Sequence, residues 1–293
     1  MSHDVLCTTR ILRIPDSDLA CTVDVRSMGG TSPRPVVVFI HGFRVHKDWG
    51  FLPRACDALA RAGAHVISYN SRYNGYLGLR SESFNEDLFA LNTVSTELAD
   101  ADIVLDALDR DLLLPEGYAR DGRIMMAGHS RGCAIALLTA ARRPDVRACA
   151  LWSPIARLLR YSERQKQLWR ARGYVRVPES ERGPAFRMNA AFLDDLEEHR
   201  KEFSLTEAMA RFHGRSALIV GAQDLATPPS EARELHRAAI ASQCTYVEIP
   251  ATGHTFGMPD LDAPLCAPCL EALRQTALVF DLPHPPVDAP TDA

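Results

Sequence analysis

The sequence predicts an α/β protein made of one domain with an insertion, and three observations support this class. Short apolar runs typical of buried strands alternate with longer amphipathic runs typical of helices. One strand, Arg123 to Ala127, leads through Gly128-His129-Ser130-Arg131-Gly132 straight into an apolar helical run at 134–141. The chain has 293 residues, 46% of them hydrophobic, which is enough for a large core.

In chain order we expect a hairpin, then alternating strands and helices, then the insertion. The hairpin strands are Val5 to Ile14 and Leu19 to Arg26, joined by the turn-forming residues Pro15-Asp16-Ser17-Asp18. The elements expected next are strands at 35–40, 64–69, 123–127 and 147–152, with helices at 48–62, 85–110 and 134–141. Two further strands are expected at 216–220 and 246–249.

The junction around Ser130 has the pattern of a nucleophile elbow. A serine hydroxyl is a poor nucleophile until a base takes its proton, so the serine has to stand in a tight strand-to-helix turn where a base can reach it. Gly128 and Gly132 leave room for that turn, since a side chain at either position would press on the neighbouring strand or helix. Ser130 is therefore the candidate nucleophile.

An elbow serine predicts an acid and then a histidine, each after a later strand. The strand at 216–220 ends in Gly221-Ala222-Gln223-Asp224, and the strand at 246–249 leads to Gly253-His254. Asp224 is the candidate acid and His254 the candidate base, although Asp224 could instead cap the helix that opens near Pro228. In the proposed chemistry His254 takes the Ser130 proton, and Asp224 fixes and stabilises the imidazole.

Two backbone N–H groups are needed for the oxyanion that forms on attack. The residue after the nucleophile, Arg131, supplies one. The strand at 35–40 is followed by His41-Gly42-Phe43, and we expect the Phe43 N–H to be the second. Removing one such donor typically costs about a hundredfold to a thousandfold in turnover.

The four segments HGF at 41–43, GHSRG at 128–132, GAQD at 221–224 and GH at 253–254 resemble the α/β-hydrolase family. The resemblance implies an eight-stranded, mostly parallel sheet with helices on both faces, and a serine hydrolase site with no metal and no organic cofactor. It is similar to the dienelactone-hydrolase-like, carboxylesterase and serine-aminopeptidase-like branches. Dienelactone hydrolases have a cysteine nucleophile, whereas Ser130 stands here; dehalogenases and epoxide hydrolases carry an aspartate there.

This order places the hydrolase core at residues 1–154 and 213–282, with a helical cap at 155–212 and a loose proline-rich tail at 283–293. Within the cap, helical runs are expected at 161–171 and 194–203. A segment inserted between the strand after the elbow and the strand before the acid would lie over Ser130. The alternative is a solvated helical surface.

For the substrate pocket the sequence offers Tyr73, Asn74 and Trp152. Tyr73 and Asn74 follow a buried strand at the same sheet edge, but Asn74-Gly75 is equally typical of a turn. Trp152 ends the strand after the elbow. We expect His41 to be a scaffold residue and the His129 side chain to point away from the nucleophile, so neither is assigned a catalytic role.

Composition excludes several function classes. The net charge is −4 and no basic cluster suits a phosphate backbone, which argues against nucleic-acid binding. The N-terminus has no apolar secretion segment and no run is long enough to span a membrane, so we expect a cytoplasmic protein with no membrane partner. Its eight cysteines are then expected to be reduced, with Cys266 and Cys269 as helix-start and packing residues and no metal site.

The function expected is hydrolysis of a carboxylic ester of a small or medium substrate through an acyl-enzyme. Two alternatives remain open. One is an aminopeptidase-like or other amide hydrolase with the same triad, which would need an acidic anchor such as Glu197 or Glu198 for the substrate amine. The other is a non-catalytic binding protein, disfavoured because all three triad residues are present. A small-molecule substrate is the only partner predicted, and the oligomeric state is not predicted.

Overall fold

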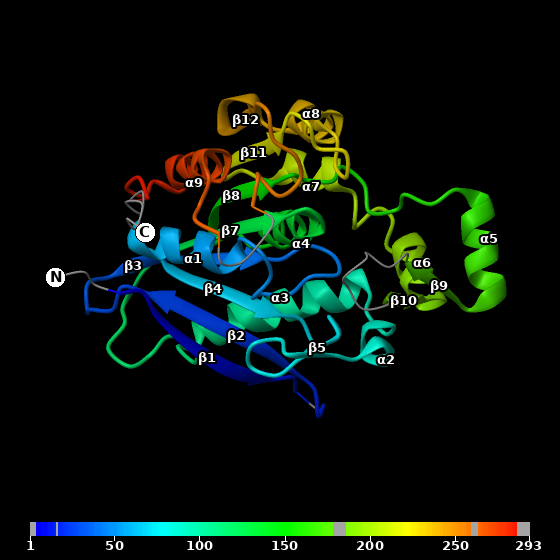
Figure 1. Cartoon of the computed structure of the whole chain (residues 1–293), viewed down its shortest axis with the longest axis horizontal. Helices are drawn as coiled ribbons and strands as arrows, with labels where there is room; N and C mark the ends of the chain where they lie inside the picture. Colours follow the sequence, from blue (N-terminus) through cyan, green and yellow to red (C-terminus); the bar gives the residue numbers. More distant parts are fainter. Residues whose placement is uncertain (1–3, 16, 178–185, 259–262, 286–293) are drawn as a thin grey trace.

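The computed structural model describes residues 4–15, 17–177, 186–258 and 263–285. An eight-stranded sheet runs through the molecule in the order β1-β2-β4-β3-β7-β8-β11-β12 (Figure 1). The strands are β1 (Leu6–Arg13), β2 (Ala20–Ser27), β3 (Arg34–Ile40), β4 (His65–Asn70), β7 (Arg120–His129), β8 (Val146–Trp152), β11 (Arg215–Gly221) and β12 (Cys244–Ile249). The β1–β2 and β2–β4 pairings are antiparallel and the other five are parallel, which confirms the mostly parallel sheet.

Helices cover both faces of this sheet because alternate side chains of its strands point to opposite sides. Val37 and Phe39 of β3 pack in the core under α1 (Leu52–Arg61) and α9 (Ala267–Phe280). Val36 and Val38 pack in the core under α3 (Val94–Asp109), α4 (Arg131–Ala140) and α8 (Pro229–Ala238). Such continuous apolar strands are typical of a parallel sheet buried on both faces.

The segment between β8 and β11 contains α5 (Glu163–Arg172), β9 (Tyr174–Val177), β10 (Phe186–Asn189), α6 (Ala190–Glu198) and α7 (Leu205–Arg211). The helices α5 and α6 and the β9–β10 hairpin form one end of the molecule, at the right of Figure 1. A hydrogen-bonded pair holds this end to the core, since Ser95 of α3 donates to the Asp195 carboxylate of α6 through its hydroxyl and, at 3.1 Å, through its backbone N–H. The hairpin and α7 were not expected from the sequence.

The helix expected at 85–110 was wrong as a single element. The structure has a short helix α2 (Glu86–Phe89), then a break, then α3. Asn85 caps the first helix and Thr93 caps the second, where Thr93 and Thr96 form a reciprocal capping box. A capping residue bonds the free N–H groups at a new helix start, so breaking the helix there costs little free energy. The helical spacing of apolar residues continues on both sides of the break, and it therefore did not reveal the break.

The remaining elements are short. They are β5 (Tyr76–Leu77), β6 (Ser83–Phe84) and a 3₁₀ turn η1 (Ala241–Gln243). The helix expected at 48–62 begins only at Leu52, with a proline in its first turn. Residues 286–293 of the expected tail lie outside the described residues. Among the helices described, none combines the length and apolar character needed to cross a bilayer.

Candidate active site

Ser130 stands at the junction of β7 and α4 in a strained backbone conformation. Its φ is 55° and its ψ is −123°, a region that residues other than glycine rarely adopt. The Ser130 N–H donates to the Trp152 carbonyl at 2.8 Å, which ties the turn to the end of β8. Held strain of this kind is common at functional sites and presents the hydroxyl above the sheet edge.

Space, rather than backbone freedom, explains the two elbow glycines. A Cβ at Gly128 would lie 2.5 Å from the Gly132 carbonyl oxygen, and a Cβ at Gly132 would lie 2.4 Å from the carbonyl oxygens of Ile40 and His41. Neither glycine has a positive φ; the only unusual angle in the motif is that of Ser130. The glycines therefore let the nucleophile turn contact the loop that begins at His41.

Asp224 and His254, the candidate acid and the candidate base, lie in direct contact. His254 Nδ1 lies 2.8 Å from Asp224 Oδ2, and the Asp224 side chain is fully buried. Three more donors reach the carboxylate: the N–H groups of Ala226 and Thr227 at 2.9 Å, and the Thr227 hydroxyl at 2.8 Å. This D-x-x-T turn is a local pattern that the sequence analysis missed.

The charge state of Asp224 follows from these contacts. Burial on its own would raise the pKa of Asp224, but the hydrogen bonds from His254 and the Thr227 N–H outweigh it and lower the pKa to about 2. An ionised carboxylate only accepts, so His254 Nδ1 must carry the proton in this pair. The Nε2 lone pair of a neutral His254 is then available to take a proton from a nucleophile.

The loops that carry the acid and the base also touch each other directly. A Cβ at Gly221 would lie 2.5 Å from the Thr252 carbonyl oxygen, and the Gln223 N–H donates to that same oxygen at 2.8 Å. The Ser130 hydroxyl has no hydrogen-bond partner among the described residues. In unliganded sites the bond between nucleophile and base is often long and tightens when substrate binds.

The two expected oxyanion donors, Phe43 and Arg131, are linked through their side chains. The Arg131 guanidinium lies 4.2 Å from the centre of the Phe43 ring, a cation–π contact, and forms an ion pair with Glu97. It also lies 5.5 Å from the Phe192 ring of α6. A Cβ at Gly42 would lie 3.3 Å from Ser130 Cβ, so the Phe43 loop passes directly beside the nucleophile.

A buried ion network anchors the other end of that loop. Lys47 is 1% exposed, and its ammonium donates to Asp24 at 2.9 Å and to Asp48 at 2.8 Å. The Lys47 N–H donates to the Asn70 side chain at 2.8 Å. The loop between β3 and α1 is therefore fixed to β2 and β4 by groups that no sequence motif indicated.

The three residues expected in the substrate pocket differ in their exposure and contacts. Trp152 was wrongly placed there: it is fully buried, it packs against Phe51 and Phe256, and its indole N–H donates to Thr276 of α9 at 2.8 Å. Asn74 is 5% exposed and its side chain accepts the Tyr76 N–H at 3.0 Å, which favours the turn-forming alternative. Tyr73 is half-buried.

The two histidines that were assigned no catalytic role, His41 and His129, differ in what they contact. His41 Nδ1 lies 2.8 Å from the Gly42 carbonyl, and burial lowers its pKa, as suits a loop scaffold residue. The expectation that His129 points away from the nucleophile did not include its contact with His254, whose ring centre lies 4.7 Å from that of His129. Nothing in the sequence around His129 reveals this contact, because it depends on a loop 125 residues further on.

Six of the cysteines are buried, Cys266 is partly buried and Cys7 is exposed. Each of the eight is a free thiol. Cys266 is the N-cap residue of α9, with its thiol 2.9 Å from the Phe256 carbonyl, and burial raises the pKa of Cys269 to about 12. In the described part of the chain, no three His, Cys, Asp or Glu side chains gather in a way that would hold a metal ion.

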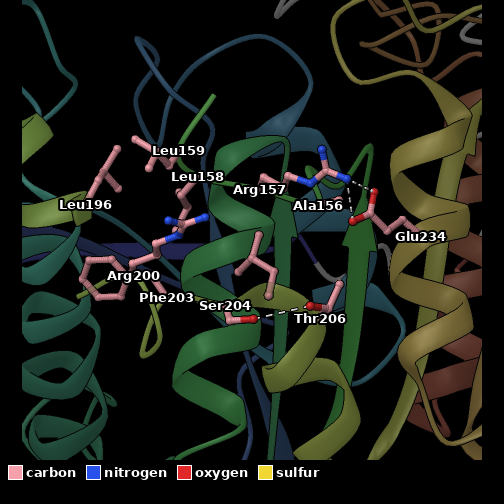
Figure 2. A pocket seen from close by; sticks show the side chains of 11 residues that line it. Ala156, Arg157, Leu158, Leu159, Leu196, Arg200, Phe203, Ser204, Thr206 and Glu234 are labelled. Carbon is pink, nitrogen blue, oxygen red and sulfur yellow. Dashed lines mark hydrogen bonds and ion pairs between the residues drawn. The ribbon is translucent and has the colours of Figure 1, made fainter. Parts of the chain in front are cut away.

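A hollow of about 250 Å³ lies beside α4, between the start of the inserted segment, the end of α6, α7 and α8 (Figure 2). Arg157 forms one wall and is paired with Glu234 of α8 at 2.8 Å. None of the residues that line it is Ser130, Asp224 or His254. It is separate from the candidate catalytic group.

Comparison with known proteins defines the family to which this fold belongs. The model of the family described as "Alpha/beta hydrolase family" matches residues 37–267, so the chain belongs to the alpha/beta hydrolase family. A sequence comparison with curated proteins gave no match.

Solved structures share the fold at low sequence identity. Est1E from Butyrivibrio proteoclasticus has a TM-score of 0.65 at 16% identity, covering 93% of this chain and 98% of that one. An esterase domain from a Rhodothermus marinus protein has a TM-score of 0.59 at 16% identity, covering 94% and 99%. The acylaminoacyl peptidase of Pyrococcus horikoshii has a TM-score of 0.62 at 15% identity, covering 95% of this chain and 41% of that one.

Proposed function

We propose that the protein is a serine hydrolase that cleaves a carboxylic ester of a small or medium substrate through an acyl-enzyme. The observation that carries this proposal is the Asp224–His254 pair at 2.8 Å beside the strained elbow of Ser130. Membership of the alpha/beta hydrolase family supports hydrolase activity. Structures named as esterases and a structure named as a peptidase share the fold. The preference for an ester over an amide therefore needs its own test.

The reaction begins when His254 Nε2 takes the Ser130 proton and Ser130 Oγ attacks the substrate carbonyl carbon. The N–H groups of Phe43 and Arg131 stabilise the oxyanion that forms. Collapse breaks the ester bond, and His254 gives its proton to the leaving alcohol. A water then gives a proton to His254 and attacks the acyl carbon. The bond to Ser130 Oγ breaks, His254 returns the proton to that oxygen, and the carboxylic acid is released.

In this proposal residues 155–212 act as the cap. The contact of Phe192 with the Arg131 side chain and the bond of Asp195 to Ser95 support a position over the nucleophile. The cap would then limit the size of the acyl or alcohol group. The hydrolase fold by itself does not determine the substrate.

Turnover of p-nitrophenyl esters from acetyl to long acyl chains tests the proposal, beside a fluorophosphonate label and a Ser130→Ala variant. We expect labelling at Ser130 and short-chain turnover that the variant loses. Labelling without turnover of any ester of the series would mean that the substrate is an amide or an ester unlike those tested. A wild-type protein that is not labelled would exclude a catalytic serine and leave the non-catalytic alternative.

A further inference from the structure

His129 is the last residue of β7 and lies directly before Ser130. Its side chain is 2% exposed, although the residue stands at the sheet edge where the catalytic loops meet. The ring is enclosed by Trp49, whose ring centre is 6.4 Å away, Phe51 at 5.1 Å and His254 at 4.7 Å. On its other side, a Cβ at Gly42 would lie 3.5 Å from His129 Nδ1.

The hydrogen bonding of this ring has one solution. His129 Nε2 lies 2.9 Å from the His254 backbone carbonyl oxygen, which can only accept, so Nε2 must carry a proton. Burial lowers the pKa of His129 to about 3, so the ring is neutral at neutral pH and Nδ1 has no proton. Among the described residues Nδ1 has no partner, which leaves the bond to His254 as the only hydrogen bond of the side chain.

His254 is therefore held through both its imidazole and its backbone. Its imidazole is held by Asp224, which follows β11, and its backbone carbonyl is held by His129, the last residue of β7. Of these two contacts, only the one with His129 ties the base to the strand that also carries the nucleophile, because residues 129 and 130 share one peptide bond. A shift of about 1 Å between reacting groups can lower a rate about a hundredfold.

We propose that His129 is a positioning residue, whose Nε2–H bond to the His254 carbonyl sets the distance between the catalytic base and Ser130. The proposal rests on the proposed serine hydrolase function. It assigns no proton transfer to His129. The alternative is that the His129 ring only fills the space between the rings of Trp49, Phe51 and His254, here called the aromatic cage.

A matched pair of amides separates these two roles. In His129→Gln the amide nitrogen is as many bonds from the backbone as Nε2, so it can still donate to the His254 carbonyl. In His129→Asn the amide nitrogen sits at the position of Nδ1 and cannot reach. Both variants place the same polar group in the cage, so a packing role predicts similar losses.

Three measurements are made on the wild type and on both variants. They are the rate of fluorophosphonate labelling at Ser130, kcat and KM for an ester that the wild type cleaves, and the midpoint of thermal unfolding. We expect Asn to lower the labelling rate and kcat by about 10- to 100-fold with little change in KM, and Gln to stay within about threefold of wild type. If Asn unfolds well below Gln, His129→Leu takes its place, since leucine fills the cage without a donor.

Two results would overturn the inference. One is equal loss in Gln and in the donor-free variant; the other is a donor-free variant with wild-type kcat. Failure of the wild type to label at Ser130 would instead overturn the proposed function, and the inference with it.

Discussion

Asp224 shows how one residue keeps a buried charge at the site. Its carboxylate is fully buried, yet four donors from His254, Thr227 and Ala226 surround it. A buried carboxylate is stable as an anion only when hydrogen bonds replace the water it loses. The local turn supplies three of those bonds before His254 arrives, so the acid site is formed within its own loop.

The lowered pKa of Asp224 predicts a pH dependence of stability. Its folded pKa of about 2 lies below the ordinary 3.8, so its stabilisation is complete above about pH 4 and is lost as pH falls through 2. We expect the stability advantage of wild type over Asp224→Asn, measured by urea unfolding, to shrink by about 1 kcal/mol between pH 5 and pH 3. Parallel stability curves for the two proteins would contradict the lowered pKa.

At the scale of elements, the β3–α1 loop depends on a charge network far from any motif. Lys47 is buried between Asp24 and Asp48 and holds the loop that presents the Phe43 N–H. Removing one partner of a buried ion pair leaves an uncompensated charge, which is more costly than removing the whole pair.

Lys47→Met is therefore expected to lower the free energy of unfolding by about 3 kcal/mol and to slow labelling at Ser130. The double variant Lys47→Met/Asp48→Asn, which removes one stranded charge as well, should recover part of both losses. Thermal unfolding and the labelling rate check this. A single variant with wild-type values in both would show that the network does not hold the loop.

The sequence predicted the positions of the candidate site residues to the extent that each residue follows a strand. Ser130, Asp224 and His254 could be placed because parallel strands end at one sheet edge and the chain order fixes which strand carries which group. Trp152 was misplaced because side chains alternate along a strand: Leu151 faces α4, while Trp152, one residue later, faces α9. The His129 bond to His254 and the Lys47 network join distant loops, and only the folded chain brings them together.

At the scale of the whole molecule, the inserted segment is attached to the core at separate points. Asp195 binds Ser95 of α3, while Arg157 and Arg160 pair with Glu234 and Glu231 of α8. Several attachments hold a segment in one orientation where a single one would leave it free to rotate. Loss of one attachment should therefore affect how substrate is enclosed more than the chemistry itself.

Ser95→Ala tests this, because it removes the hydroxyl bond to the Asp195 carboxylate and leaves the backbone N–H in place. We expect a loss of about 1 to 2 kcal/mol in unfolding free energy and a KM raised about three- to tenfold, with kcat changed less. Ser242→Ala, which removes an exposed hydroxyl from η1 (Ala241–Gln243), is the matched control and should leave both unchanged. An unchanged KM in Ser95→Ala would mean that this end of the molecule does not enclose substrate.

The strand order described above also bears on how the proposed activity would appear during folding. Phe43 follows β3, Ser130 follows β7, Asp224 follows β11 and His254 follows the edge strand β12. Bringing such distant parts of a chain together is slow, because the entropy of closing long loops is lost before the contacts form. A chain with β3 and β7 paired but β12 still unpaired would hold the proposed nucleophile without the proposed base. Recovery of activity after dilution from denaturant should therefore report completion of the entire sheet, and should lag behind the recovery of helical structure.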